Sequence, residues 1–142
     1  MQYRRTAVIS KRDGVKMTWF KLDKIGIAHE DERRSITALF NGDFFANQVK
    51  ILRIKKQSVL GNHYHRYREL FYVLEGQVTY LLENVATQEK QMITLGQGDR
   101  LIIEPNVAHK AEMFEGTVTL EATEESYVSA EKNDVRYEIK CF

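Results

Sequence analysis

Two of the four histidines in this chain, His63 and His65, stand one residue apart in the stretch GNHYHRYREL, and Glu69 follows shortly after. Imidazole and carboxylate groups can bind a divalent cation, and they can also exchange protons with a substrate near neutral pH. The stretch could equally be the polar, solvated end of a strand. The elements that position these side chains decide between the two interpretations.

Side chains alternate faces along an extended strand. His63 and His65 would therefore project to one side and Tyr64 to the other. In the next strand Glu69 would share a face with Phe71, which would bury its carboxylate beside an apolar core. A buried charge needs a partner.

A third imidazole is available to provide that partner. His109, in the stretch EPNVAHKAEM, lies at the end of another predicted strand. Three neutral imidazoles around a divalent cation would neutralise a buried Glu69. His29 stands outside this set, and we expect it to be a loop residue.

The elements around these residues are short segments with period two, rich in β-branched and aromatic side chains. We predict strands at Lys16–Leu22, Ser35–Asp43, Val49–Lys56, Glu69–Gly76, Gln77–Asn84, Lys90–Gly96, Arg100–Pro105 and Thr117–Glu124. Turn signals such as EGQ, GQGD and FEGT separate them. The stretch at 83–90 is expected to form a protruding hairpin, and the stretch at 126–135 one or two helical turns. This pattern predicts a single all-β domain over residues 1–142, of the sandwich or small-barrel type.

Composition narrows the class of partner. The 21 basic and 20 acidic residues give a formal net charge of +1, so the totals indicate neither a nucleic-acid-binding surface nor any other polyanion-binding one. No apolar run is long enough for a transmembrane helix, and the N-terminus lacks the apolar core of a signal peptide. A single cysteine, Cys141, fits a reducing compartment. We therefore expect a cytoplasmic protein without a membrane partner.

The spacing His63-x-His65-x3-Glu69-x6-Gly76 resembles the first motif of the cupins, and the stretch from Gly98 to His109 resembles their second. This resemblance covers about residues 44–124, with 1–43 as N-terminal strands and loop and 125–142 as a C-terminal tail. It implies a cupin-type β-barrel, also called a double-stranded β-helix or jelly roll, with little helix. It also implies a homodimer, formed through an outer sheet face or an exchanged N-terminal strand.

The same resemblance carries the cupin metal ligands onto four residues of this chain. They are His63, His65, Glu69 and His109. Such a set suits a divalent transition metal such as Zn, Fe, Mn, Ni or Co.

A finer resemblance concerns activity. The runs DERRSITALF, VKILRI and LGNHYH are similar to those of sugar-modifying cupins: RmlC-like dTDP-4-dehydrorhamnose epimerases, WxcM-like dTDP-sugar ketoisomerases and the C-terminal cupins of capsular polysaccharide biosynthesis. The resemblance implies an isomerase or epimerase acting on a keto-sugar or a similar carbonyl compound. Its candidate catalytic residues are His63, His65 and Tyr80. Two alternatives stay open: an iron-dependent dioxygenase and a non-catalytic small-molecule-binding cupin.

Basic residues near the motif suggest how a nucleotide sugar would be held. Arg66 and Arg68 follow the histidine pair and are expected near the mouth of the barrel, where arginine can grip phosphate by bidentate hydrogen bonds. The alternative is that both point into solvent. The stretch Val49–Lys56, with Lys50 among its cations, is interpreted as a strand with a solvated basic face, or as part of the same phosphate-attracting rim.

Overall fold

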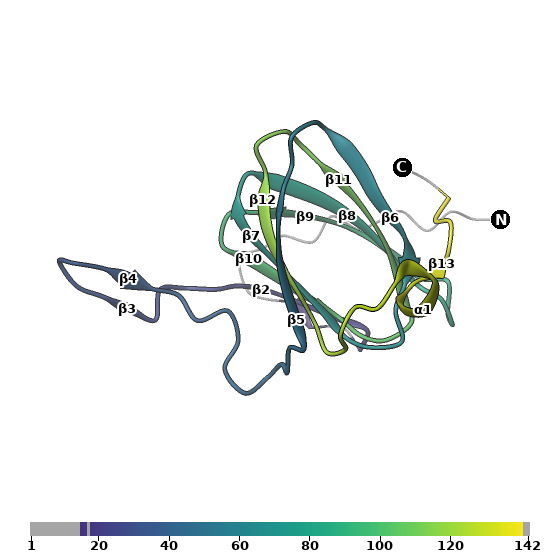
Figure 1. Ribbon diagram of the computed structural model, residues 1–142, viewed down its shortest axis with the longest axis horizontal. Helices are drawn as coiled ribbons and strands as arrows, with labels where there is room; N and C mark the ends of the chain where they lie inside the picture. The colour runs from purple at the N-terminus through teal and green to yellow at the C-terminus, as the bar shows by residue number, and fades with distance from the viewer. Residues whose placement is uncertain (1–14, 17, 141–142) are drawn as a thin grey trace.

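The computed structural model describes residues 15, 16 and 18–140, which form short antiparallel strands and one helical turn (Figure 1). Their bounds, in chain order, are β1 (Val15–Lys16), β2 (Phe20–Lys24), β3 (His29–Glu30), β4 (Ser35–Ile36), β5 (Gln48–Arg53), β6 (Ser58–Tyr64), β7 (Glu69–Glu75), β8 (Gln77–Asn84), β9 (Lys90–Gly96), β10 (Asp99–Ile103), β11 (Val107–Met113), β12 (Val118–Thr123), α1 (Ala130–Asn133) and β13 (Val135–Arg136). Cys141 lies outside the described residues.

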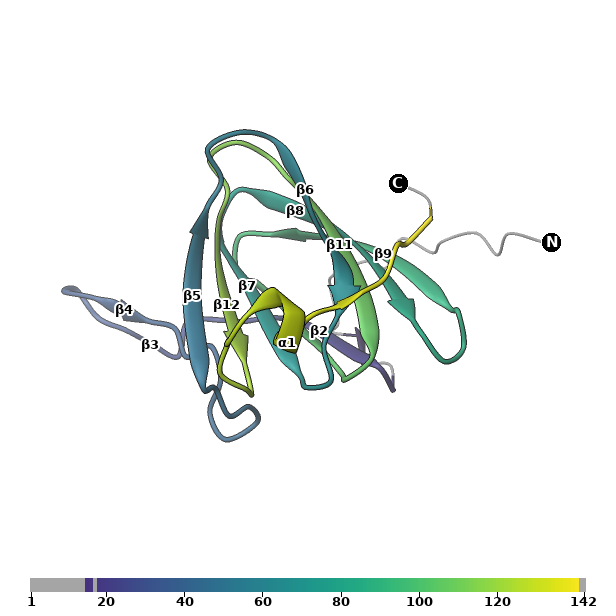
Figure 2. The same cartoon turned by 45° about the vertical axis from the view of Figure 1, so that its right-hand side comes forward.

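Two antiparallel sheets face each other and curve into a barrel (Figure 2). One has the strand order β1-β2-β10-β7-β12-β5 and the other β13-β6-β11-β8-β9. Strands β7 and β8 are neighbours in the chain but lie in different sheets, as a jelly roll requires. The predicted all-β fold with little helix is confirmed.

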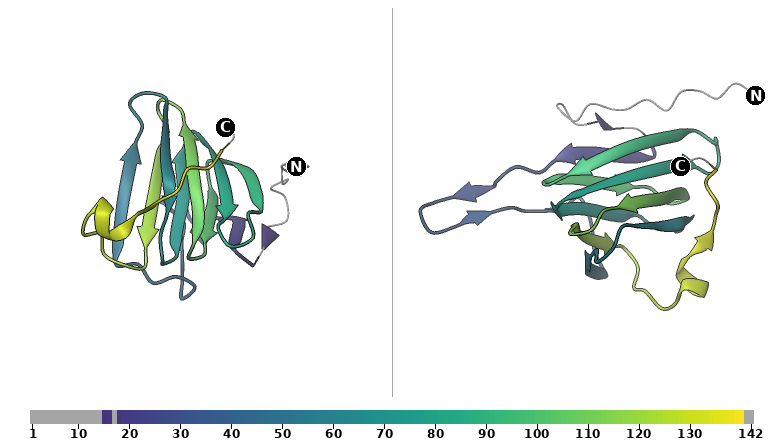
Figure 3. Two further views of the ribbon diagram at one scale, coloured as in Figure 1. Left: turned by 90° about the vertical axis from the view of Figure 1, so that its right-hand side faces the viewer. Right: turned by 90° about the horizontal axis from the view of Figure 1, so that it is seen from above.

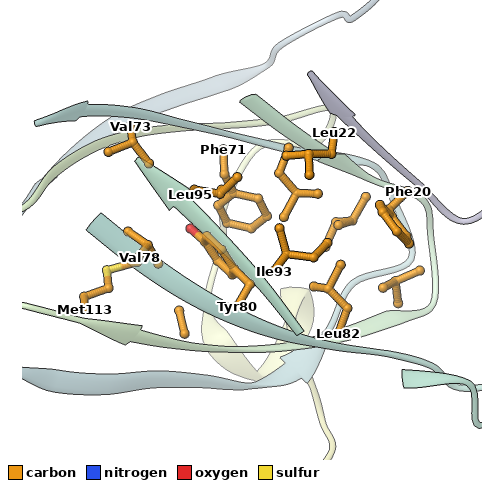
Figure 4. Close-up of a cluster of buried hydrophobic side chains, with 14 of the residues drawn as sticks. Phe20, Leu22, Phe71, Val73, Val78, Tyr80, Leu82, Ile93, Leu95 and Met113 are labelled. Atoms are coloured by element: carbon orange, nitrogen blue, oxygen red, sulfur yellow. The ribbon is translucent and has the colours of Figure 1, made fainter. Parts of the chain in front are cut away.

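The two sheets enclose one apolar core, to which both contribute alternate side chains (Figure 4). Phe71 and Leu101 come from the six-stranded sheet, and Tyr80 and Leu82 from the other. Burying a side chain of this size contributes roughly 1.5–3 kcal/mol, so the core dominates the energetics of the barrel. Phe71 and Tyr80 also face the cavity described below.

Segments outside the barrel cover both outer sheet faces. Phe44 packs on the outer face of β7 and β12 through Leu70 and Ala122. Ile139 packs with Leu81 on the outer face of β8. In addition, β2 from the N-terminal part and β13 from the C-terminal part are hydrogen-bonded into the two sheets.

The predicted strand at 35–43 is wrong over most of its length, because β4 covers only Ser35–Ile36. Strands β3 and β4 pair only with each other in a ribbon that extends away from the barrel (Figure 3). The following chain is a loop, fixed to the sheet by Phe44 and by Arg100, whose guanidinium donates to the Leu39 carbonyl and to Asp43. The apolar residues of this loop pack against a face of the sheet but do not form a strand.

The predicted helical turn near the C-terminus is confirmed. It is α1, capped by the Ser129 hydroxyl, which accepts from the Lys132 amide at 3.2 Å. Strand β13 follows and pairs with the end of β6. Within the described residues, no helix is long and apolar enough to cross a lipid bilayer.

Candidate functional site

The histidines meet where β6 and β11 pair. His63 and His109 are register partners, and the register shifts between His109 and Lys110. Gly61 (φ 99°) makes this irregular pairing possible, since a Cβ there would lie 2.6 Å from the His109 carbonyl oxygen. His109 therefore belongs to β11 and not, as the sequence suggested, to the end of the strand at 100–105.

The three imidazoles form a compact cluster inside the barrel. Their ring centroids lie 4.8 Å apart for His63 and His65, 4.6 Å for His63 and His109, and 5.5 Å for His65 and His109. One nitrogen of each ring lies within 4.8 Å of the others. These are distances at which three imidazoles can share one ion.

Glu69 completes the set predicted from the sequence. Its Oε2 atom lies 3.1 Å from Nε2 of His65 and 3.6 Å from Nε2 of His109. Burial alone would raise the pKa of Glu69, but the adjacent His65 and His109 outweigh burial and lower it. Nevertheless Oε2 is buried and accepts no hydrogen bond from the described residues. Such an oxygen needs a metal cation or a proton donor, which a protonated His65 would provide.

The segment around α1 orients His65. Its Nδ1 atom donates to the Asn133 carbonyl at 2.9 Å and lies 3.4 Å from a carboxylate oxygen of Asp134. Its ring stacks on Tyr67, with centroids 4.9 Å apart and planes at 9°. Tyr67 in turn accepts a hydrogen bond from the Asn133 side chain. Nδ1 is thereby occupied, and Nε2 is directed at Glu69.

This arrangement fits a divalent transition metal. A metal-binding histidine commonly donates its second nitrogen to a carbonyl or carboxylate, as His65 does. Burial lowers the pKa of His63 and lowers that of His109 to about 4, so both rings are neutral at pH 7, the form that binds metals. The buried, unsatisfied Glu69 oxygen supplies the negative charge.

The cluster opens into a cavity of about 370 Å³ inside the barrel. It is lined by Gln48, Lys50, Leu52, Leu60, Gly61, His63, His65, Tyr67, Glu69, Phe71, Tyr80, His109, Ala111, Met113, Glu121, Thr123, Tyr127 and Asp134. Away from the histidines the wall carries a second charged group, Lys50 and Glu121, and the polar residues Gln48 and Thr123 among apolar side chains. A small number of polar groups in an apolar cavity is typical of a ligand site.

This second group differs from what the sequence predicts for β5. Lys50 was interpreted as part of a solvated basic face or rim, but it lines the cavity, with its ammonium 3.2 Å from Oε2 of Glu121. The apolar residues of β5, Val49 and Ile51, point outward and are more than half exposed. Along β5, Lys50 and Leu52 alternate with Val49 and Ile51, so the two pairs lie on opposite faces of the strand. Hydrophobicity favours the opposite orientation, with Val49 and Ile51 facing inward.

Charge and burial act on this pair together. Burial raises the pKa of Glu121 to about 7, with a further contribution from the Glu69 charge, although Lys50 opposes both. Burial alone would lower the pKa of Lys50, but Glu121 and Glu69 outweigh it and raise that pKa. Lys50 is therefore protonated at pH 7, while Glu121 exchanges a proton near that pH.

Tyr80 lies in the cavity wall, as predicted for a tyrosine inside the barrel. It is fully buried, and its hydroxyl has no hydrogen-bond partner among the described residues. Burial, then the charges of Glu121 and Glu69, raise its pKa well above the usual value. Tyr80 is therefore a neutral residue whose hydroxyl, unpartnered in the described part of the chain, is buried among the apolar side chains of the core beside the cavity.

The two predicted phosphate-binding arginines do not line the cavity. Arg68 donates from its backbone and its side chain to one oxygen of Glu124, both at 2.9 Å, and its guanidinium lies 5.3 Å from the centre of the Phe44 ring. Arg66 is exposed. Phosphate binding by Arg66 and Arg68 therefore stays a prediction. Arg66, which is exposed, is the better candidate of the two.

His29 lies on the exposed β3–β4 ribbon, where its ring contacts Asp31 at 3.3 Å. It is not part of the imidazole cluster, as expected.

Comparison with known proteins agrees with this fold. A model of the cupin domain matches residues 50–128. This chain belongs to the cupin family, which confirms the resemblance seen in the motifs. A comparison with curated proteins finds no match.

Solved structures with the same fold include sugar-modifying enzymes. The sugar 3,4-ketoisomerase QdtA from Thermoanaerobacterium thermosaccharolyticum, in complex with TDP, is 23% identical with a TM-score of 0.70, over 85% of this chain and 90% of that one. The TDP-quinovose 3,4-ketoisomerase WlaRB from Campylobacter jejuni is 19% identical with a TM-score of 0.73, over 84% and 94%. The dTDP-4-dehydrorhamnose 3,5-epimerase from Sulfolobus tokodaii is 16% identical with a TM-score of 0.72, over 90% and 86%.

Proposed function

We propose that this chain is an isomerase or epimerase acting on a keto-sugar, free or nucleotide-linked. The observation that carries the proposal is the cavity itself, which is lined by the three imidazoles and by Tyr80. The structural likeness to ketoisomerases and an epimerase supports the choice of substrate class.

Both reactions begin by removing the proton on a carbon next to the carbonyl. His63 suits this step, because burial lowers its pKa and leaves the ring neutral at pH 7. Tyr80 suits the opposite role, as a protonated donor to a substrate oxygen.

A divalent transition metal would be held by His63, His65, His109 and Glu69, where it would polarise a carbonyl oxygen. A ring nitrogen that binds an ion cannot take up a proton at the same time. Metal ligation and proton abstraction by the same nitrogen of His63 or His65 therefore exclude each other. The metal content of the active protein separates the two mechanisms.

The size of the cavity fits part of a nucleotide sugar. Small-molecule sites span roughly 300–1,000 Å³, and this one lies near the lower limit. We propose that the sugar ring enters the cavity while a nucleotide remains outside, within reach of Arg66. Binding of TDP should then weaken in Arg66→Ala, and equal affinity of variant and wild type would contradict this placement.

The test of the function is proton exchange. The protein is incubated in D2O with TDP-4-keto-6-deoxyglucose, which occupies a variant of QdtA in a crystal structure, and deuterium incorporation is followed by NMR. We expect deuterium at a carbon next to the carbonyl, and its loss in His63→Ala. Oxygen uptake by the iron-loaded protein would instead identify a dioxygenase. Binding without exchange or oxygen uptake would identify a non-catalytic binder.

A further inference from the structure

We propose that Lys50 and Glu121 form a second catalytic group, which moves a proton between two substrate oxygens while the imidazole cluster moves a proton between two carbons. This inference rests on the proposed function and makes it more specific. It assigns the chain to the ketoisomerases, because an epimerase does not need the oxygen-to-oxygen step.

The two groups enter the cavity from different sheets. Lys50 and Glu121 are register partners on β5 and β12 of the six-stranded sheet. His63 and His109 are register partners on β6 and β11 of the five-stranded sheet. All four residues line the same cavity. A substrate bound there would have one polar group on each side.

Moving a carbonyl to the neighbouring carbon needs both groups. The imidazole takes the proton from the carbinol carbon, and the electrons of the broken C–H bond form a C=C bond as the carbonyl π electrons move to oxygen. That oxygen takes a proton from Lys50, giving an enediol. The other enediol oxygen then loses its proton to Glu121, its electrons form the new carbonyl, and the former carbonyl carbon takes the proton from the imidazolium. A final transfer from Glu121 to Lys50 restores both groups.

The pair has the chemistry that this sequence requires. An ammonium offers up to three donors and favours a developing negative charge on oxygen, while a carboxylate accepts the hydroxyl proton. The two groups are 3.2 Å apart, which is close enough for a proton to pass between them. The Glu121 side chain is 8% exposed, whereas that of Lys50 is 45% exposed, so the donor remains free to follow the substrate.

A purely structural ion pair would give a different result from a proton-transferring one. Without Glu121, the imidazole can still remove the carbon-bound proton and return a solvent deuteron to the same carbon, because Lys50 still donates to the carbonyl oxygen. The carbonyl, however, cannot migrate. Loss of Glu121 should therefore separate exchange from isomerisation, an effect that loss of folding or binding cannot produce.

The experiment uses TDP-4-keto-6-deoxyglucose in D2O and measures deuterium in the recovered substrate and the amount of 3-keto product. The variants are Lys50→Met and Glu121→Gln, with Lys24→Met, an exposed strand lysine outside the cavity, as the matched control. General acid–base groups contribute about 100- to 10,000-fold, so we expect product formation to fall at least about 100-fold in both variants. Exchange should stay within about tenfold of wild type in Glu121→Gln and should fall together with product formation in Lys50→Met.

The outcomes separate the two levels of inference. Product formation within about threefold of wild type in both variants, or a joint fall of product formation and exchange in folded Glu121→Gln, would overturn the role of the pair and leave the proposed function standing. A folded wild type with neither exchange nor product would overturn the proposed function, and this inference with it. Circular dichroism establishes folding, and Lys50→Arg, which keeps the charge, should recover part of the product.

Discussion

Oε2 of Glu69 lies 3.1 Å from Nε2 of His65, yet this buried oxygen accepts no hydrogen bond from the described residues. Nδ1 of His65 donates to the Asn133 carbonyl, so a neutral ring would point a lone pair at a carboxylate. Two facing lone pairs repel each other. The contact is stable only with a cation between them or a proton on Nε2, and the raised pKa of His65 shows that the site favours a positive charge there.

The first prediction concerns the cation. If the imidazole cluster is a metal site, purified protein carries close to one divalent transition metal ion per chain by elemental mass spectrometry, and the ligating nitrogen of His63 is then not the base. His63→Ala and His109→Ala each remove a ligand and should strongly reduce the metal content. His29→Ala is the matched control, because His29 lies on the exposed ribbon. Metal-free protein with full activity after EDTA treatment would show that the site holds a proton instead.

The second prediction separates stability from activity at Tyr80. Tyr80→Phe removes a buried hydroxyl that has no hydrogen-bond partner, so the free energy of unfolding should stay constant or rise by up to about 1 kcal/mol. If the hydroxyl donates to the substrate, turnover should fall about 100-fold. Urea denaturation and steady-state kinetics measure the two effects.

Tyr137→Phe is the control for Tyr80. Tyr137 donates to Glu83 at 2.8 Å on the outer side of the barrel, so its loss should cost up to about 1.5 kcal/mol and leave turnover constant. Unchanged turnover in Tyr80→Phe would exclude Tyr80 as the donor.

The imidazole site could be predicted from the sequence because its signal is local. His63, His65 and Glu69 lie within seven residues, and their spacing alone determines which side of each strand they occupy. The Cβ-free Gly61 permits the close approach of β6 to β11, and the positive φ of Asn106 (62°) lies in the turn between β10 and β11. Only the position of His109 within its strand was wrong.

The charged pair could not be predicted, because its meaning depends on which face of β5 is buried. Val49 and Ile51 are more apolar than Lys50 and Leu52, so hydrophobicity pointed the wrong set inward. The strand is at the edge of its sheet in the described part of the chain, where the apolar face is left more than half exposed. Arg68 illustrates the same limit, since its partner Glu124 lies 56 residues away.

The third prediction concerns the loop that precedes β5. Arg100 is buried and donates to both carboxylate oxygens of Asp23, at 2.9 and 2.7 Å, as well as to Asp43 and the Leu39 carbonyl. Arg100→Met should lower the free energy of unfolding by about 2–3 kcal/mol, less than for a fully buried pair because the aspartates keep contact with water. Lys21→Ala removes an exposed partner of Asp23 and should cost under about 1 kcal/mol. Equal losses in urea denaturation would contradict this ranking.

The fourth prediction concerns assembly. We expect a homodimer formed through the outer face at β5, since Val49 and Ile51 are 53% and 54% exposed on an edge strand of the described sheet. The other predicted route, an exchanged N-terminal strand, stays a prediction as well. Light scattering after size-exclusion chromatography should show a dimer for wild type and a monomer for Ile51→Asp. Dissociation by Ile27→Asp instead would place the contact on the β3–β4 ribbon, where Ile27 is 56% exposed.

The last prediction is the pH dependence of stability set by Glu121. Burial raises the pKa of Glu121 in the folded protein to about 7, from 4.5 for an ordinary glutamate. Between these values the folded state keeps a proton that the unfolded state has lost, so this residue stabilises the fold below pH 4.5 and the contribution disappears as the pH rises to 7. The total change is about 3 kcal/mol.

Glu121→Gln removes this titration and leaves that of Glu69 and His109 in both proteins. The free energy of unfolding of the variant, relative to wild type, should therefore rise by up to about 3 kcal/mol between pH 5 and pH 8. Urea denaturation at unit intervals of pH measures it, with the exposed Glu115→Gln as the control expected to stay within about 0.5 kcal/mol of wild type. If the wild-type and Glu121→Gln curves run parallel across this range, Glu121 is ionised throughout, and its ion pair with Lys50 must outweigh its burial.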